Sequence, residues 1–178
     1  MRFSALFIAG TLAVALAGLH AQEVDDSEIA AIVVTANQVD VDAGKLARQR
    51  AGNSEVKQFA ERMVSDHEGV NKQAVALAKK LKLTPKENET SRAIKAGGDK
   101  NLATLKTLSG AAFDKAYVDH EVVYHAQVLE ALDKTLIPGA SNSELKALLV
   151  KVRPAFVAHL EHAKHIQANL NSSRSDLP

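Results

Sequence analysis

The sequence predicts an all-α protein, a ferritin-like four-helix bundle, and three observations support this prediction. Along four long segments, apolar residues recur at alternating spacings of three and four, which is the pattern of amphipathic helices. The chain of 178 residues has only four prolines and nine glycines, which favours helices over short strands and turns. A link of roughly 25 residues joins the second and third segments, and this length allows the crossover connection of ferritin-like bundles.

Charge and cysteine content exclude several classes of protein. Lys and Arg number 22 and Asp and Glu number 21, with both signs spread along the chain. A nucleic-acid-binding protein concentrates basic charge on one face, so we expect no nucleic-acid partner. The chain has no Cys, which rules out a disulfide scaffold, a thiolate zinc site and covalently attached c-type haem.

Residues 1–21 are predicted to be a secretory signal peptide. Arg2 gives a positive start, and the apolar run from Ala5 to Leu19 is too short and too rich in small residues for a comfortable membrane span. Cleavage is expected after Ala21, with Ala17 as a second option. The alternative, an uncleaved anchor, lacks the usual aromatic belt. We therefore expect a periplasmic or secreted protein that is not integral to the membrane after cleavage. Association with the outer membrane is left open.

The first helix is expected from Ser27, its capping residue, to about Arg50, with Gly52 ending it. The positions that face the core are expected to be Ile29, Val33, Ala36, Asp40, Ala43 and Ala47.

The second helix is expected from about Asn53 to Leu83 and carries the clearest heptad pattern of the chain. It stops at Thr84 because the residue before a proline, here Pro85, is disfavoured in the helical region. Its core positions are expected to be Val56, Ala60, Met63, His67, Val70, Ala74, Leu77 and Leu81.

The polar stretch that follows is interpreted as a crossover rather than a fifth core helix. Gly97 and Gly98 interrupt it, so two short helical pieces are expected, Ser91 to Ala96 and Asp99 to Leu108.

The third long helix is expected from Gly110 to about Leu136, closed by Pro138 and Gly139. Its core positions are expected to be Val118, Val122, His125, Leu129, Leu132 and Leu136.

The fourth helix is expected to open at Ser141, with Glu144 in the spacing of a capping box, and to bend at Pro154. The bundle domain then spans 22–172 and residues 173–178 form a frayed tail. The core positions of this helix are expected to be Leu145, Leu148, Val152, Phe156, His159, Ala163, Ile166 and Leu170.

Four runs of sequence closely resemble an exported bacterial family known as domain of unknown function 4142. The resemblance covers the whole mature chain and implies a ferritin-like helical bundle in the periplasm or outer envelope, with no established activity. The family pattern usually has Glu where this chain has Asp40 and Asp42. The four runs are VDVDAGKLA from Val39, VKQFAERMVSDHEGVNKQ from Val56, LKTLSGAAFDKAYVDHEVVYH from Leu105 and RPAFVAHLEHAK from Arg153.

The histidines are the best candidates for chemistry. His67, His125 and His159 occupy core positions on three different helices, and Asp40 occupies one on the fourth. All four lie within about three residues of the middle of their helices, or roughly 5 Å at 1.5 Å rise per residue. Neutral imidazoles with a carboxylate suit tetrahedral Zn, or Cu, Fe or Mn with a solvent position added. The sequence therefore predicts that these residues bind a divalent transition metal.

Several neighbours are candidates for further ligands or for partners that orient the imidazoles. Glu121 lies one turn before His125, and Asn71 lies one turn after His67. The hydroxyls of Tyr117 and Tyr124 are expected nearby.

Other histidines and Asp66 are expected at the margins of the site. His162 is interpreted as a flanking residue that reaches the site at most from the side, His120 as a weaker candidate, and His165 as solvated. Asp66, beside His67, points about 100° away and is interpreted as solvated or salt-bridging.

Two alternatives to a metal site remain open. In the first, the buried histidines form a structural polar network with Asp40, Asp114 and the tyrosines. In the second, Met63 and a histidine hold a b-type haem.

A catalytic di-iron centre is disfavoured by a specific test. Such bundles use two Glu-x-x-His pairs. The residues three positions before the mature histidines are Val64, Tyr117, Val122, Phe156, His159 and His162, and none is a carboxylate.

Two functions follow from the sequence, and whether the protein is an enzyme stays open. One is an exported bundle that binds a metal or small ligand through its core histidines. The other is a non-catalytic envelope or stress protein that acts through protein partners or as a homo-oligomer.

Overall fold

The computed structural model describes residues 24–175 as an all-α bundle, with no strand in that range, and this confirms the predicted fold class. The predicted signal peptide lies outside the described residues. The helices are α1 (Asp26–Arg50), α2 (Ser54–Leu81), α3 (Glu89–Lys106), α4 (Gly110–Ala131), the π-helical η1 (Leu132–Leu136), the short α5 (Ile137–Gly139) and α6 (Ser143–Ser175).

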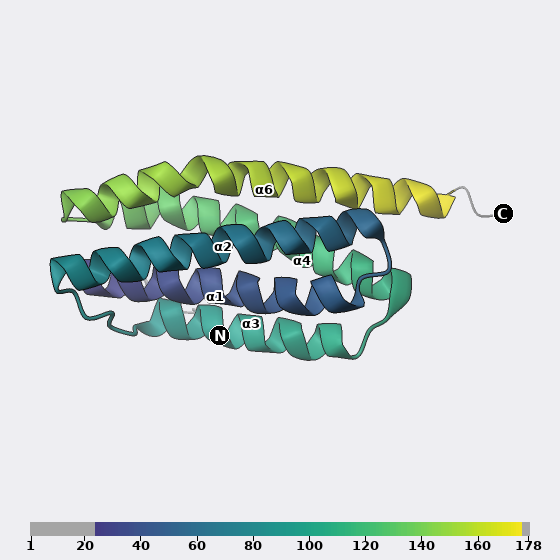
Figure 1. Cartoon of the computed structure of the whole chain (residues 1–178), viewed down its shortest axis with the longest axis horizontal. Coiled ribbons are helices and arrows are strands. Elements are labelled where there is room, and N and C mark those ends of the chain that lie inside the picture. The colour runs from purple at the N-terminus through teal and green to yellow at the C-terminus, as the bar shows by residue number, and fades with distance from the viewer. Residues whose placement is uncertain (1–23, 176–178) are drawn as a thin grey trace, which may run out of the picture.

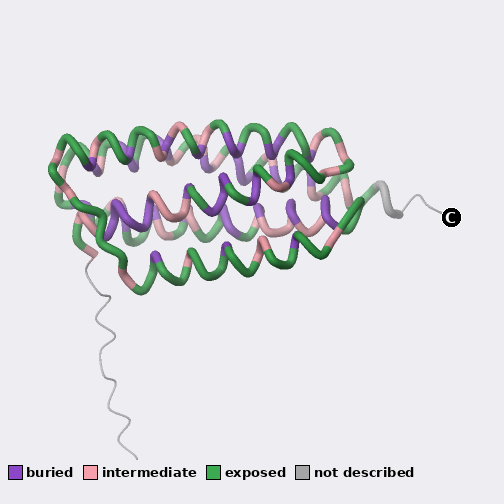
Figure 2. The backbone as a smooth tube through the Cα atoms, turned by 60° about the horizontal axis from the view of Figure 1, so that its bottom comes forward, coloured by how far each residue is buried: buried purple, intermediate pink, exposed green. Residues whose placement is uncertain are grey.

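Four long helices enclose the core, and α3 lies outside them. In Figure 1, α1 and α2 run side by side, α4 and α6 form the facing pair, and α3 follows the outer side of α1. Buried residues lie on the inward sides of the helices, whereas α3 is exposed along most of its length (Figure 2). The α6 helix stays continuous through Pro154 and arches over the bundle.

The crossover differs from its prediction, because α3 is one continuous helix of 18 residues instead of two short pieces. Glycine lowers helix propensity, but tertiary packing overrides it here. A Cβ atom at Gly98 would lie only 2.6 Å from Cγ2 of Val39 on α1, whereas one at Gly97 would meet nothing within 4 Å. The bare backbone at Gly98 thus lets α3 approach α1 closely.

Two helix starts also differ from their predictions by one or two residues. The cap of α1 is Asp25, which forms a capping box with Glu28, rather than Ser27. The cap of α6 is Asn142, whose Oδ1 accepts from the backbone N–H of Glu144 and Leu145, rather than Ser141. In both cases an Asp or Asn close by takes the capping position, and these residues are among the strongest caps.

The third long helix is predicted to end at about Leu136, but α4 continues through the π-helical turn η1 into the short α5 and ends at Gly139. The N–H of Ile137 donates to the carbonyl of Leu132, five residues earlier. Pro138 follows directly, and a proline has no N–H to donate and its ring crowds the carbonyl four residues before it. The wider turn is consistent with that missing hydrogen bond.

The core divides into two apolar clusters with a polar layer between them. One cluster includes Ile29, Val70, Leu132 and Leu149, and the other lies towards the opposite ends of the same helices. Each of the four long helices contributes to one cluster with one half and to the other cluster with its other half. The buried histidines and acids lie near the middle, between the two halves. Among residues 24–175, no helix combines the length and apolarity needed to cross a bilayer.

Candidate metal centre

Three imidazole rings meet in the polar layer. His67 on α2, His125 on α4 and His159 on α6 are each at most 2% exposed. Their ring centroids form a nearly equilateral triangle, with separations of 5.5 Å (His67 to His125), 5.2 Å (His67 to His159) and 5.4 Å (His125 to His159). Phe156 stacks on the His67 ring at 5.1 Å and closes one side of the group.

Each ring uses one nitrogen to bond a fixed partner. Nδ1 of His67 lies 2.7 Å from Oδ1 of Asn37, and Nδ1 of His125 lies 3.1 Å from the backbone carbonyl of Glu121. Nε2 of His159 lies 2.8 Å from Oδ2 of Asp66. Because each partner is an oxygen that accepts, the proton of each neutral ring belongs on the nitrogen that faces it.

The other nitrogen of each ring carries a lone pair and is left without a hydrogen bond. Nε2 of His67, Nε2 of His125 and Nδ1 of His159 are fully buried and have no hydrogen-bond partner among the described residues. One ring nitrogen of each residue lies within 4.8 Å of one from each of the other two. Buried polar atoms without partners are rare and costly in native proteins, so this convergence requires an explanation.

Two buried carboxyls adjoin the imidazoles. Ligand atoms of Asp40, Glu121 and His125 lie within 4.8 Å of one another, and Oδ2 of Asp40 is 3.5 Å from Nε2 of His67. Oε2 of Glu121 lies 3.3 Å from Nδ1 of His125, and the carboxyls of Asp40 and Glu121 are close enough to share a proton in a hydrogen bond. The layer therefore holds three imidazoles and two carboxyls without a Lys or Arg among its buried residues.

Burial keeps most of these groups neutral at pH 7. Burial, and then the charge of Glu121, raises the pKa of Asp40 well above its usual range. Burial raises the pKa of Glu121 to about 8. Burial and the two neighbouring imidazoles lower the pKa of His67, and burial lowers that of His159 to about 4. Neutral imidazoles are the form that coordinates metal.

The five residues predicted as ligands, Asp40, His67, Glu121, His125 and His159, all lie in this one buried layer. The hydroxyl of Tyr117 is also buried and has no hydrogen-bond partner among residues 24–175, and its pKa is raised by burial and by the charges of Glu121 and Asp40.

Other predicted neighbours have different partners. Nδ2 of Asn71 donates to the backbone carbonyl of Val34. The hydroxyl of Tyr124 donates to the backbone carbonyl of Ala36. Asp114 accepts from the N–H groups of Gly52 and Asn53 at the start of α2, so it does not belong to the histidine network.

Among the other described histidines, His120 stacks its ring on Tyr124, and His162 and His165 lie at the margins of the site. His162 packs its ring against Phe59, and His165 is 67% exposed beside Glu55.

Asn37 and Asp66 are the two contributors that sequence reasoning missed. Asn37 lies three residues before Asp40 and therefore shares its helix face, which was a usable signal. Asp66 was interpreted as solvated or salt-bridging, and it does lie 3.3 Å from Arg62. It also reaches His159 on α6, because its half-exposed side chain bridges α2 and α6. That contact depends on the packing of two helices and leaves no pattern in the sequence.

Comparison with known proteins agrees with the predicted family. The family model described as "Domain of unknown function (DUF4142)" matches residues 12–166. The chain belongs to the DUF4142 family. No curated protein sequence matches this family member closely enough to count as a relative. Among solved structures, it is similar to "CopM in the Cu(II)-bound form", with a TM-score of 0.63 and 17% identity over 82% of this chain and 98% of that one. At this identity the likeness shows that the two proteins share a fold.

Proposed function

We propose that this DUF4142 protein binds one divalent transition-metal ion in its core. The free nitrogens of His67, His125 and His159 are the ligands in this proposal, and Asp40 or Glu121 adds a carboxylate oxygen. The proposal is carried by three buried imidazoles that lie together, each offering a ligand nitrogen within 4.8 Å of the others and each with one ring nitrogen that has no hydrogen-bond partner among the described residues. Asn37, the Glu121 carbonyl and Asp66 hold the opposite nitrogens, as carboxylates and carbonyls do for metal-bound histidines.

A purely structural network explains these contacts less well. In such a network the buried nitrogens and carboxylate oxygens pair with one another or with donors, because an unpaired buried polar atom costs about 1–3 kcal/mol. Here the carboxyls of Asp40 and Glu121 can pair with each other, but three ring nitrogens are unpaired among the described residues. A divalent cation accepts all these lone pairs at once, and the two carboxylates balance its charge.

The site fits a metal after a small inward movement of the rings. Nitrogen ligands lie about 2.0–2.1 Å from zinc, so two ligands of a tetrahedral ion are roughly 3.3 Å apart. One ring nitrogen of each histidine lies within 4.8 Å of one from each of the other two. Rotation of the rings about their side-chain bonds supplies any contraction from that upper limit to the separation that a metal requires.

Copper is the expected preference among the candidate metals. Affinity for nitrogen and oxygen sites follows the order Mn(II) < Fe(II) < Cu(II) > Zn(II). The structural neighbour, with the same fold, was solved with Cu(II) bound, which supports the same class of ion here. We expect Cu(II) to bind most tightly, Zn(II) next and Mn(II) most weakly.

The proposal is tested by titrating metal-free protein with each ion and following both binding and the melting temperature. Metal at 100 times its Kd stabilises by about 2.7 kcal/mol, which raises the melting temperature by roughly 5–10 °C for a domain of this size. His159→Gln is expected to lose most of this shift. His165→Gln, the same substitution at an exposed histidine on the same helix, is expected to keep it.

Two results would support the structural network instead. One is a wild-type protein that binds none of these ions, and the other is a metal response that survives in His67→Gln, His125→Gln and His159→Gln alike. Melting of each metal-free variant by circular dichroism shows whether it still folds, so loss of binding is separated from loss of structure.

We also propose that the protein is exported, on the basis of the charged start and apolar run of residues 1–21. N-terminal sequencing of the protein from its native host is expected to begin at Gln22. Recovery of an N-terminus at Met1 would contradict export by cleavage.

A further inference from the structure

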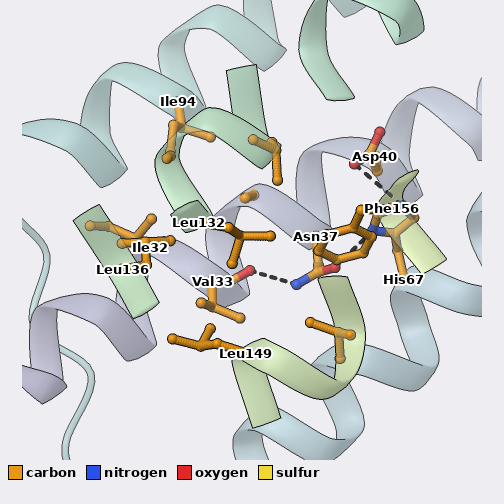
Figure 3. A pocket seen from close by; sticks show the side chains of 14 residues that line it. Ile32, Val33, Asn37, Asp40, His67, Ile94, Leu132, Leu136, Leu149 and Phe156 are labelled. Carbon is orange, nitrogen blue, oxygen red and sulfur yellow. Dashed lines mark hydrogen bonds and ion pairs between the residues drawn. The ribbon is translucent and has the colours of Figure 1, made fainter. Parts of the chain in front are cut away.

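A small apolar pocket opens directly onto the histidine layer. It lies beside His67 and Asp40 and extends between α1, η1 and α6 toward Ile94 on α3 (Figure 3). Its volume is about 40 Å³. Aliphatic side chains form the walls, with Ile32 and Val33 from α1 and Leu132 and Leu136 from η1 among them.

The pocket offers little to a water molecule, because His67 and Asp40 reach its polar end but nearly all of the surface that it exposes is apolar. The amide of Asn37 faces it, but its Nδ2 donates to the carbonyl of Val33 at 2.7 Å and its Oδ1 accepts from His67. Both hydrogen-bonding groups of this side chain are therefore already used. An ordered buried water needs two to four polar partners, and cavities without them stay dry and take up apolar guests. The pocket therefore suits an apolar occupant.

The size of the pocket limits that occupant to a very small molecule. About 10–15 Å³ of this kind of volume holds one water-sized molecule, so the pocket has room for roughly three. A diatomic or triatomic gas fits, and an aromatic ring or lipid chain does not. Part of the wall is the π-helical turn, a feature that occurs frequently at functional sites.

We propose that this pocket binds a small apolar gas of the size of dioxygen and holds it beside the histidine cluster. The binding step depends only on the pocket. Its relation to a metal ion rests on the proposed function, because His67 belongs both to the pocket wall and to the candidate ligand set.

Xenon is the probe for the binding step, since it is apolar, small and visible by ¹²⁹Xe NMR and in crystals under pressure. Wild-type protein is expected to hold one xenon atom between Ile32 and Leu132. Ala131→Leu places a larger side chain in the pocket wall and is expected to abolish this binding. Ala126→Leu, the same change at an exposed position on α4, is expected to leave it unchanged.

A second variant keeps the test decisive if Ala131→Leu fails to fold. Val152→Ala removes two methyl groups from the pocket wall and is expected to increase xenon occupancy. Ordered water in place of xenon in the wild-type pocket, or occupancy unaffected by both wall variants, would overturn the proposal.

The relation to the metal is tested separately. His159 does not line the pocket, so the His159→Gln variant is expected to keep xenon binding while losing metal binding. The two proposals can therefore fail independently. In protein loaded with Cu(II), which is paramagnetic, bound xenon is expected to relax faster than in protein loaded with Zn(II). Equal relaxation in protein shown to contain Cu(II) would overturn the placement of the gas beside the metal.

Discussion

The buried carboxyl of Glu121 makes the stability of the metal-free protein depend on pH in a specific direction. Burial raises its pKa from 4.5 to about 8 in the folded protein. The folded state therefore holds a proton that the unfolded chain has released above pH 4.5. This contribution is fully present below pH 4.5 and is lost as the pH rises through 8. Between pH 6.5 and 8 the predicted loss is about 2 kcal/mol.

The histidines do not mask this effect in that window. The pKa of His159 falls from 6.5 to about 4 on folding. A group with a lowered pKa contributes stability above its unfolded value, here 6.5, which is lost as the pH falls through 4. Its contribution is thus nearly constant between pH 6.5 and 8, where the pH slope comes from the two buried carboxyls, Glu121 and Asp40, because the pKa of Asp40 is raised in the same direction.

Urea denaturation in the presence of a chelator measures this slope. From pH 6.5 to 8, wild-type protein is expected to lose at least about 2 kcal/mol of unfolding free energy, and Glu121→Gln is expected to lose about 2 kcal/mol less than wild type, because only Asp40 then adds to the slope. Glu130→Gln, at an exposed glutamate on the same helix, is expected to behave as wild type. The same pH slope in wild type and Glu121→Gln would refute the assignment of a buried proton to Glu121.

Three further predictions concern packing and the support of the ligands. Gly98→Ala is expected to destabilise the folded protein by about 1–3 kcal/mol because its new Cβ meets Val39. Gly97→Ala, where a Cβ meets nothing, is expected to stabilise it by about 0.5–1 kcal/mol. Thermal melting of the two variants tests both expectations. Leu149→Ala is expected to cost about 2–5 kcal/mol by urea denaturation, and a cost below 1 kcal/mol would contradict its place in the core. Asn37→Ala is expected to weaken metal binding about 10- to 100-fold, measured by competitive titration, and unchanged affinity would show that the hydrogen bond to the imidazole has no role.

Much of the fold was predictable because its information is local. Apolar spacing marks the inward face of each long helix, and Pro85 and Pro138 mark the points where helices end or change. The continuity of α3 was not predictable in the same way. Two adjacent glycines lower helix propensity, and only the close approach of Gly98 to Val39 explains why the helix continues there.

The members of the candidate site were predictable because their positions along each helix are local information. A histidine on an apolar stripe is visible in the sequence, and equal distance from the helix ends places His67, His125 and His159 at one level. The hydrogen bonds that orient the rings depend on side chains from neighbouring helices. The contact of Asp66 with His159 spans 93 residues of sequence, so it emerges only from the packed structure.

X-ray absorption spectroscopy of the metal-loaded protein tests the central claim most directly. With one equivalent of Cu(II) or Zn(II), the account predicts three imidazole ligands and at least one oxygen ligand, with metal–nitrogen distances of about 2.0 Å. Replacing His159 by Gln is expected to remove one imidazole from that shell or abolish binding. A shell made of oxygen alone, or one that the His159→Gln substitution leaves unchanged, would contradict the account.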